Sequence, residues 1–167
     1  MNTPTAVATY VFGLVVVVLI GVVIRRMLGG WRRRAERQAE IIGALPALPD
    51  QLGPAVIAPT TGLYVGSTLA PGWLERVNAG DLGYRCKAVL TRYPEGILME
   101  RLGAAEIFVP ETSITGLRVE SAMAGKVGPD ILVIRWRLPS GTEIDTGFRG
   151  DGRRDYTAWT QSKGEAA

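Results

Sequence analysis

A long uncharged apolar stretch lies near the N-terminus of this chain. Residues 6–24 (AVATYVFGLVVVVLIGVVI) carry no charged side chain, and thirteen of these nineteen residues are Val, Leu, Ile or Phe. A helix of this length spans about 28 Å at about 1.5 Å per residue, close to the hydrocarbon thickness of a bilayer. We therefore predict a transmembrane helix over residues 6–24, preceded by an extracytoplasmic tail at residues 1–5.

Two other interpretations fit this stretch less well. A secretory signal peptide has a basic segment before its apolar core and a small-residue cleavage site after it. Residues 1–5 contain no Lys or Arg, and Arg25 and Arg26 follow the apolar stretch directly. A buried helix this long and this rich in β-branched residues needs a large protein around it, and 143 residues follow. The membrane span is therefore the interpretation that the residues favour.

The charges beside the span predict its orientation. Residues 25–40 carry six arginines and two glutamates, a local net charge of +4, whereas residues 1–24 carry no charged side chain. Cationic flanks remain on the cytoplasmic side, so we expect the N-terminus outside the cell membrane and the rest of the chain in the cytoplasm. Residues 41–167 carry 13 basic and 14 acidic side chains, so the overall charge of +3 belongs to the anchor. The single cysteine, Cys86, excludes an intrachain disulfide and agrees with this location.

After the span, residues 25–43 form a basic juxtamembrane segment, in which we predict a helix over 29–42 that lies on the membrane surface. One face of that helix carries Trp31, Ala35, Gln38, Ala39 and Ile42. We assign to the membrane interface Arg25, Arg26, Trp31, Arg32, Arg33, Arg34 and Arg37. Contact with anionic lipid headgroups and a pure topology signal both explain these arginines. Nucleic-acid binding is not expected, because neither interleaved aromatic residues nor a recognisable fold accompanies them.

Prolines dominate the next segment, residues 44–61. Pro46, Pro49, Pro54 and Pro59 are spaced too closely for a helix or a central strand. We predict either a Pro-rich linker or an extended lead-in that packs along the following domain. A linker of this composition would be semi-rigid and would hold the domain off the membrane.

Residues 62–161 have the pattern of an antiparallel β domain, because β-branched and polar residues alternate between turns that contain Gly or Pro. The seven expected strands are 63–69, 84–91, 97–102, 106–109, 114–120, 131–138 and 143–148. The alternation places Trp136 and Phe148 in the core. A short C-terminal helix, with Asp151 as its N-cap and Tyr156 and Trp159 on one side, closes an open corner of the sandwich. The last residues, 162–167, are expected to form a flexible tail.

Two connections between these strands carry specific expectations. Residues 71–83 (PGWLERVNAGDLG) predict a short helical turn and a loop, with Trp73, Leu74 and Val77 at helical spacing. These three side chains are expected to close one end of the core. Residues 124–130 (AGKVGPD) are expected to form a loop.

The sequence resembles a family of actinobacterial single-span membrane proteins that carry a bacterial pleckstrin-homology-like (PH-like) domain and are often labelled as transporter or export proteins. Its segments 62–70, 73–85, 95–103, 108–118, 124–128 and 145–150 carry the resemblance. The resemblance implies a fold, an N-terminal membrane helix followed by a mainly-β PH-like domain of about seven strands with a short C-terminal helix. It implies no established chemistry.

The residues needed for common catalytic chemistry are missing from the sequence. The chain has no histidine and one cysteine, so an imidazole base and a thiolate zinc site are both excluded. Gly125-Lys126 is not a P-loop, because Val127 follows where Ser or Thr is needed. Glu143 and Asp145 share a strand face, which we interpret as solvated rather than as an acid–base pair. We predict no enzyme activity, no catalytic residue, no cofactor and no metal.

Three classes of function remain, and all place the protein at the lipid bilayer. The first is a membrane-tethered, non-enzymatic interaction module that holds a membrane or cytoplasmic protein partner, with Arg135 and Arg137 as a partner surface. The second is an accessory subunit of a transporter or export system. The third is a sensor of anionic lipid surfaces through the basic juxtamembrane segment, since residues 71–83 contain only Arg76 as a basic residue for direct headgroup contact.

Overall fold

The computed structural model of the chain describes residues 3–72, 74–152 and 156–161, with backbone alone for residues 3–9, 30–37, 126, 129 and 161. The chain divides into two compact units, residues 1–37 and residues 38–167. The first unit is helical, and the second contains all the strands.

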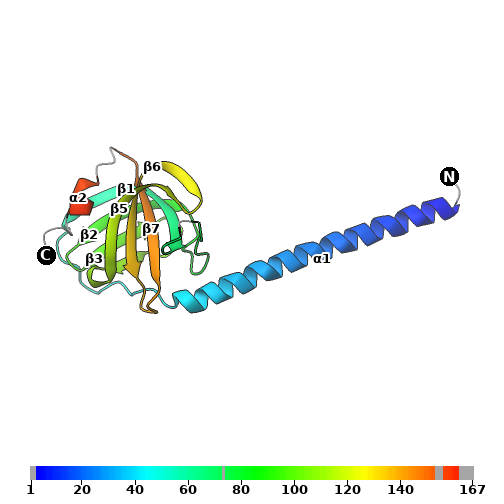
Figure 1. Cartoon of the computed structure of the whole chain (residues 1–167), viewed down its shortest axis with the longest axis horizontal. Helices are drawn as coiled ribbons and strands as arrows, with labels where there is room; N and C mark the ends of the chain where they lie inside the picture. Colours follow the sequence, from blue (N-terminus) through cyan, green and yellow to red (C-terminus); the bar gives the residue numbers. More distant parts are fainter. Residues whose placement is uncertain (1–2, 73, 153–155, 162–167) are drawn as a thin grey trace. The chain divides into compact units, whose positions relative to one another are not determined.

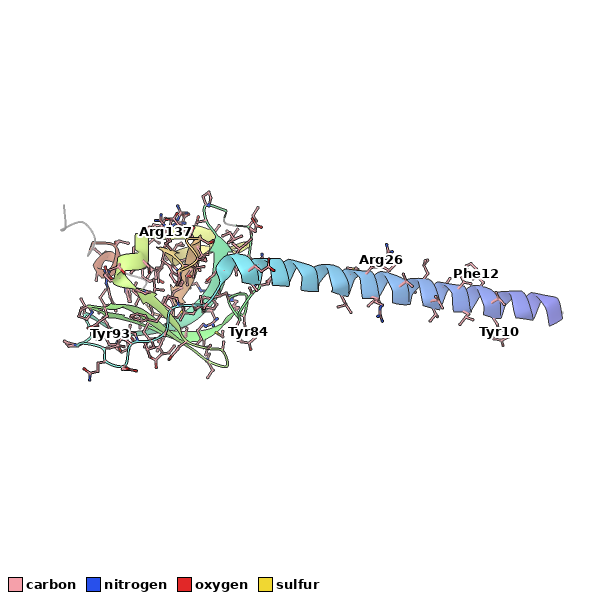
Figure 2. The ribbon with its side chains drawn as sticks, turned by 90° about the horizontal axis from the view of Figure 1, so that it is seen from below. Tyr10, Phe12, Arg26, Tyr84, Tyr93 and Arg137 are labelled. Atoms are coloured by element: carbon pink, nitrogen blue, oxygen red, sulfur yellow. The ribbon has the colours of Figure 1, made fainter. Side chains whose placement is uncertain are left out.

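One long α-helix, α1 (Thr3–Ile42), fills the first unit, and its last turn belongs to the second. Within α1, the stretch Tyr10–Gly29 is long and apolar enough to cross a membrane, and none of it is buried. Figure 2 shows Tyr10, Phe12 and Arg26 projecting from this helix. We predicted a separate surface helix over 29–42, whereas the helical backbone continues through this region without a break.

The last turn of α1 is part of the second unit's core. Ile42 is only 3% exposed and packs among the buried residues of the domain. The Gln38 side-chain amide donates a hydrogen bond to the Arg76 carbonyl oxygen (3.3 Å) and accepts one from the Asn78 backbone N–H (3.0 Å). Our prediction that Gln38 and Ile42 face lipid is therefore wrong, because the domain itself buries both side chains.

Seven antiparallel strands form one sheet, as predicted, and Figure 1 shows that this sheet is strongly curled. The strands are β1 (Ile57–Leu69), β2 (Cys86–Tyr93), β3 (Gly96–Arg101), β4 (Ile107–Pro110), β5 (Ile114–Met123), β6 (Lys126–Arg137) and β7 (Glu143–Gly150). Their order in the sheet is β4-β3-β2-β1-β7-β6-β5. A 3-10 turn, η1 (Glu111–Ser113), connects β4 to β5.

The core lies between the two halves of the curled sheet. It joins Ile97 of β3 and Ile107 of β4 to Ile134 and Trp136 of β6, strands that lie on opposite sides of β1 in the sheet order. Trp136 is fully buried, and its Nε1 donates a hydrogen bond to Thr146 Oγ1 at 2.9 Å. The predicted inward positions of Trp136 and Phe148 are confirmed, because both side chains are fully buried.

β1 departs from the predicted alternation. Its register shifts between Tyr64 and Gly66 along its pairing with β7, so the strand contains a bulge. As a result Tyr64 and Ser67, three residues apart, share the interior and bond to each other at 2.9 Å. Val65, two residues before Ser67, belongs instead to a second, smaller apolar cluster.

Residues 124–130 are mostly strand and not a loop. Ala124 and Gly125 both have positive φ (51° and 71°), so β5 turns directly into β6 through a two-residue connection. β6 therefore begins at Lys126, five residues before the predicted strand. The long β5–β6 hairpin that results is important for the site described below.

The connection before β2 also differs from prediction. Leu74 is exposed, Val77 is fully buried as expected, and Trp73 lies outside the described residues. Leu82, which we did not single out, is fully buried as well. The described residues between β1 and β2 contain turns and no helix.

The Pro-rich segment packs along the domain rather than standing free of it. Gly53 N–H donates to the Glu95 carboxylate (3.1 Å), and Val56 N–H donates to the Arg92 carbonyl oxygen (2.8 Å). β1 begins at Ile57, inside the range that we predicted as linker or lead-in. The observed arrangement corresponds to the lead-in.

A short helix, α2 (Thr157–Gln161), follows the sheet. Trp159 and the preceding Tyr156 are buried in the core, as predicted. The Gly150 N–H donates to the Tyr156 hydroxyl at 2.8 Å, which ties the end of β7 to this corner. Asp151 lies in a bend before residues 153–155, which are outside the described residues, and α2 begins later than an N-cap at Asp151 would place it.

Candidate functional site

The predicted membrane-interface residues all lie in α1. Arg25 and Arg26 are exposed and directly follow the uncharged residues 6–24, near the C-terminal end of the stretch Tyr10–Gly29. The side chains of the other five, Trp31, Arg32, Arg33, Arg34 and Arg37, lie outside the described residues. For these five, the assignment to the interface stays a prediction.

The predicted partner residues Arg135 and Arg137 project from the outer face of β6, away from the main core. Each lies opposite an acidic residue of β7 in the strand register. Arg137 Nη2 bonds Glu143 Oε1 at 3.1 Å, and Arg135 Nη2 bonds Asp145 Oδ2 at 2.8 Å. The structure therefore shows that both arginines of the predicted partner surface are paired with carboxylates of β7.

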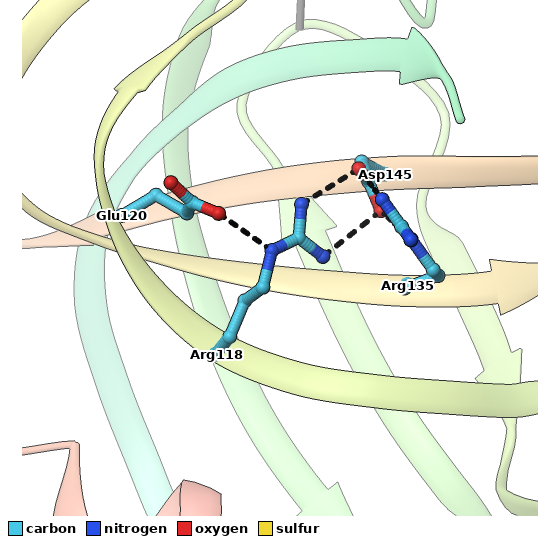
Figure 3. A network of polar contacts seen from close by, with 4 residues as sticks. All are labelled: Arg118, Glu120, Arg135 and Asp145. Carbon is cyan, nitrogen blue, oxygen red and sulfur yellow. Dashed lines mark hydrogen bonds and ion pairs between the residues drawn. The ribbon is translucent and has the colours of Figure 1, made fainter. Parts of the chain in front are cut away.

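Asp145 is the centre of a larger ionic cluster that sequence reasoning missed (Figure 3). Arg135 donates to it through Nε and Nη2, both at 2.8 Å. Arg118 of β5 donates through Nη1 (3.3 Å) and Nη2 (2.8 Å), and through its Nε to Glu120 at 2.7 Å. We call Arg118, Glu120, Arg135 and Asp145 the arginine–aspartate cluster.

Burial differs strongly within this cluster. The Asp145 side chain is 3% exposed, whereas the side chains of Arg118 and Arg135 are 35% and 30% exposed. Our interpretation of Asp145 as part of a solvated strand face is therefore wrong. A buried carboxylate is costly unless it is paired, and the two guanidinium groups supply four charge-assisted hydrogen bonds.

The cluster also fixes the charge state of its members. Burial, the largest single effect, acts to raise the pKa of the Asp145 carboxyl. The hydrogen bonds and charges of Arg135 and Arg118 together outweigh burial and hold this pKa below its ordinary value. The hydrogen bond to Asp145 in turn raises the pKa of both guanidinium groups. All three groups are ionised at neutral pH.

The β5–β6 hairpin folds over this face and creates a second apolar cluster. Met123 and Ala124, at the hairpin end, are buried together with Val65, Ile131 and Val133 on the side of the sheet away from the main core. Gly147 makes room for the hairpin, because a Cβ at this position would lie 2.3 Å from Met123 Sδ. A larger residue at position 147 would displace Met123.

Between hairpin and sheet lies a pocket of about 300 Å³. Its lining comprises Thr68, Pro71, Arg118, Glu120, Ala122, Met123, Val133, Arg135 and Asp145. The arginine–aspartate cluster thus supplies the polar part of the pocket, and the hairpin supplies apolar walls.

Thr68 contributes an unusual group to this pocket. It lies opposite Asp145 in the β1–β7 register and is fully buried. Its Oγ1 has no hydrogen-bond partner among the described residues. Buried hydroxyl groups are normally hydrogen-bonded, so an unpaired one beside a pocket is informative.

The remaining reactive side chains do not form an activated centre in the described part of the chain. Burial raises the pKa of the Cys86 thiol, so the unreactive protonated form predominates. No group of three acidic or Cys side chains that could hold a metal ion occurs among the described residues. The arrangement on the outer face offers hydrogen bonds and charge to a ligand or partner.

Arg118, Glu120, Thr68 and Met123 were not singled out from the sequence. Arg118 and Glu120 do occupy alternate positions of a predicted strand, which placed them on one face. Nothing in the sequence indicated that the hairpin would cover that face, because residues 126–130 read as loop.

Comparison with known proteins identifies the family of the domain. No curated protein and no solved structure matches the chain. A family model described as Bacterial PH domain-like matches residues 42–164, a range that starts at the last residue of α1 and includes all seven strands and α2. The match covers most of the chain and agrees with the curled antiparallel sheet and its C-terminal helix. The chain therefore belongs to the Bacterial PH domain-like family.

Proposed function

We propose that this protein is a single-pass membrane protein that holds its PH-like domain in the cytoplasm as a non-enzymatic interaction module. The observation that carries the proposal is the helical stretch Tyr10–Gly29, which is long and apolar enough to cross a membrane and is unburied. At about 0.3–0.6 kcal/mol per residue, the thirteen large apolar residues of 6–24 favour insertion by about 4–8 kcal/mol. In water, the exposure of the same apolar side chains would be unfavourable in free energy.

The orientation follows from charge. Arg25 and Arg26 directly follow the apolar stretch, and no charged side chain precedes it. The positive-inside rule then places the domain in the cytoplasm. The free thiol of Cys86 is compatible with that reducing compartment.

The function of the domain is best supported as protein binding through the outer face of β5, β6 and β7. Arg137 is more exposed than its ion-pair partner Glu143, because the arginine side chain is 60% exposed. Arg135, two residues before Arg137 on the same strand, lines the pocket. Exposed arginines of this kind can exchange an internal partner for one on another protein with little loss of energy. PH-like domains in general bind proteins or lipids, which supports the same class of function.

Contact of the basic segment with anionic lipid is a second candidate, supported by Arg32, Arg33, Arg34 and Arg37. Each arginine near an anionic leaflet contributes about 1 kcal/mol of attraction. The burial of Gln38 and Ile42 in the domain shortens the face available for this contact to the residues before Gln38.

Crosslinking and co-purification of the full chain from native membranes test the main proposal. We expect a defined protein partner with the wild-type chain, and its loss with Arg137→Glu. Lys87→Glu, an exposed charge reversal on β2 outside this face, is the matched control and should retain the partner. Equal recovery with all three chains would reject the proposed surface, and recovery of lipid alone would favour the second candidate.

A further inference from the structure

The pocket beneath the β5–β6 hairpin has features of a ligand site that a merely structural ion cluster does not need. Its volume is about 300 Å³, and it lies outside the main core. Thr68 Oγ1 is buried beside it without a hydrogen-bond partner among the described residues. Five of its nine lining residues are polar or charged and four are apolar, so it offers hydrogen-bonding groups beside an apolar wall. Ligand pockets use such polar groups to fix the orientation of the bound molecule.

We propose that this pocket binds the carboxylate group of a small organic acid with a short apolar tail. The proposal goes beyond protein binding and does not depend on it. The carboxylate would be bound by Arg118, Arg135 and the Thr68 hydroxyl, while the tail packs under the hairpin.

The hydrogen-bond inventory leaves donors for such a ligand. Asp145 occupies Nε and Nη2 of Arg135, which leaves Nη1 without a partner among the described residues. The Thr68 hydroxyl is a second free group that can donate. Both residues line the pocket, and they flank Asp145 in the register of β1, β7 and β6.

Glu120 occupies the position on Arg118 that the ligand would take. It holds Arg118 by a single bond to Nε, and its side chain is 43% exposed. Asp145, in contrast, accepts four hydrogen bonds and is 3% exposed. Glu120 can therefore leave at little cost, whereas Asp145 stays and keeps the two guanidinium groups in place.

Charge balance selects the kind of anion. Two arginines and two carboxylates make the cluster formally neutral, and removal of Glu120 from the cluster leaves one positive charge. A monoanionic carboxylate restores neutrality, whereas dianionic phosphate adds a second negative charge beside the buried Asp145. Met123, Val133 and Ala122 give the tail an apolar wall.

Calorimetric titration of the full chain in a non-ionic detergent tests this proposal at constant ionic strength. The probes are butyrate, its neutral analogue butyramide, and inorganic phosphate. The variants are Thr68→Val, which keeps the shape of the side chain but removes the hydroxyl, and Glu120→Gln. Glu143→Gln is the matched control, because Glu143 pairs with Arg137 on the same face but does not line the pocket.

We expect saturable binding of butyrate and none of butyramide or phosphate. Thr68→Val should weaken butyrate binding about threefold to tenfold, the value of one hydrogen bond. Glu120→Gln should tighten it, an effect opposite to that of damaging a structural ion pair, and Glu143→Gln should leave it unchanged.

Several results would overturn the proposal: absence of butyrate binding, equal binding of butyramide, tighter binding of phosphate, or weaker butyrate binding by Glu120→Gln. The unfolding midpoint of each variant shows whether it is folded, and Thr68→Val is expected to match the wild type or exceed it, since it removes an unpaired buried hydroxyl. Failure here would leave the proposed protein interaction intact, because that is judged by partner recovery with Arg137→Glu.

Discussion

The two faces of the β5–β7 part of the sheet differ in the side chains that they carry. The inner face presents Trp136, Ile144 and Phe148 to the main core, and each of these side chains is fully buried. The outer face presents Arg118, Arg135 and Asp145, joined by charge-assisted hydrogen bonds under a folded-over hairpin. The same three strands thus carry an apolar core on one side and a partly covered ionic cluster on the other.

The inner face therefore stabilises the fold, whereas the outer face is available for binding. The inner face excludes water and gains its stability from apolar burial and packing. The outer face leaves arginines about one-third exposed, so its ion pairs contribute less to stability and can be rearranged by a ligand. Substitutions on the two faces should therefore differ in size and in kind.

The largest effect is expected on the inner face. Trp136→Ala removes a fully buried side chain together with its hydrogen bond to Thr146. We expect a loss of about 3–5 kcal/mol in the free energy of unfolding, measured by denaturant titration of the full chain in detergent micelles. Val119→Ala, at a 45% exposed position, is the control and should change stability by less than about 0.5 kcal/mol. A loss below about 1 kcal/mol for Trp136→Ala would contradict the assigned core.

A smaller loss is expected where the hairpin covers the outer face. Met123→Ala removes a buried side chain from the second apolar cluster, which has few members and can collapse around the gap. We expect about 2 kcal/mol, at the low end for a large-to-small substitution. Val127→Ala on the same hairpin is 84% exposed and should be nearly neutral. Equal effects of the two substitutions would show that the hairpin does not fold over the sheet in solution.

The ionic cluster should contribute less than either apolar cluster. Asp145→Asn leaves two neighbouring guanidinium groups without their shared carboxylate, and we expect a loss of about 1–2 kcal/mol after allowing for their solvent exposure. Glu143→Gln breaks the more exposed pair with Arg137 and should cost less than about 0.5 kcal/mol. If both substitutions cost the same, Asp145 is not the buried centre of the cluster.

The pH dependence of stability should show the smallest effect. The pKa of Asp145 is lowered in the folded state, so its contribution is complete above the ordinary aspartate pKa of about 3.9 and is lost as pH falls through the lower folded value. The stability difference between wild type and Asp145→Asn should therefore be constant from pH 7 to about pH 5 and shrink below about pH 4. A difference that shrinks already between pH 7 and pH 5 would contradict the lowered pKa.

Alternation in the sequence was sufficient to predict the inner face. Trp136 and Phe148 lie where their spacing placed them, because one side of each of these strands is buried and the other is not. All seven strands were found, with boundaries that shift most at β1 and β6. The bulge between Tyr64 and Gly66 and the tight turn at Ala124 depend on local backbone geometry that the pattern of residues did not show.

The outer face could not be predicted in the same way. Asp145 looked like an ordinary solvated residue and Arg135 like part of an exposed partner surface, because the sequence does not say which distant segment will cover a strand. The hairpin turn from Met123 to Lys126 covers that face and creates the pocket. Gly147 leaves the space that the Met123 side chain occupies. Likewise, the charge pattern that predicted a surface helix could not show that Gln38 and Ile42 would be buried by the domain.

The membrane topology of the two ends of the chain tests whether a single span holds the domain in the cytoplasm. Cys86 is the only cysteine and is buried, so Cys86→Ala gives a background for single-cysteine labelling with a membrane-impermeant maleimide. We predict that Asn2→Cys is labelled in intact cells and that Ser162→Cys is labelled only after the cells are permeabilised. Labelling of Ser162→Cys in intact cells, or recovery of the chain in the soluble fraction, would contradict a cytoplasmic domain held by a single membrane span.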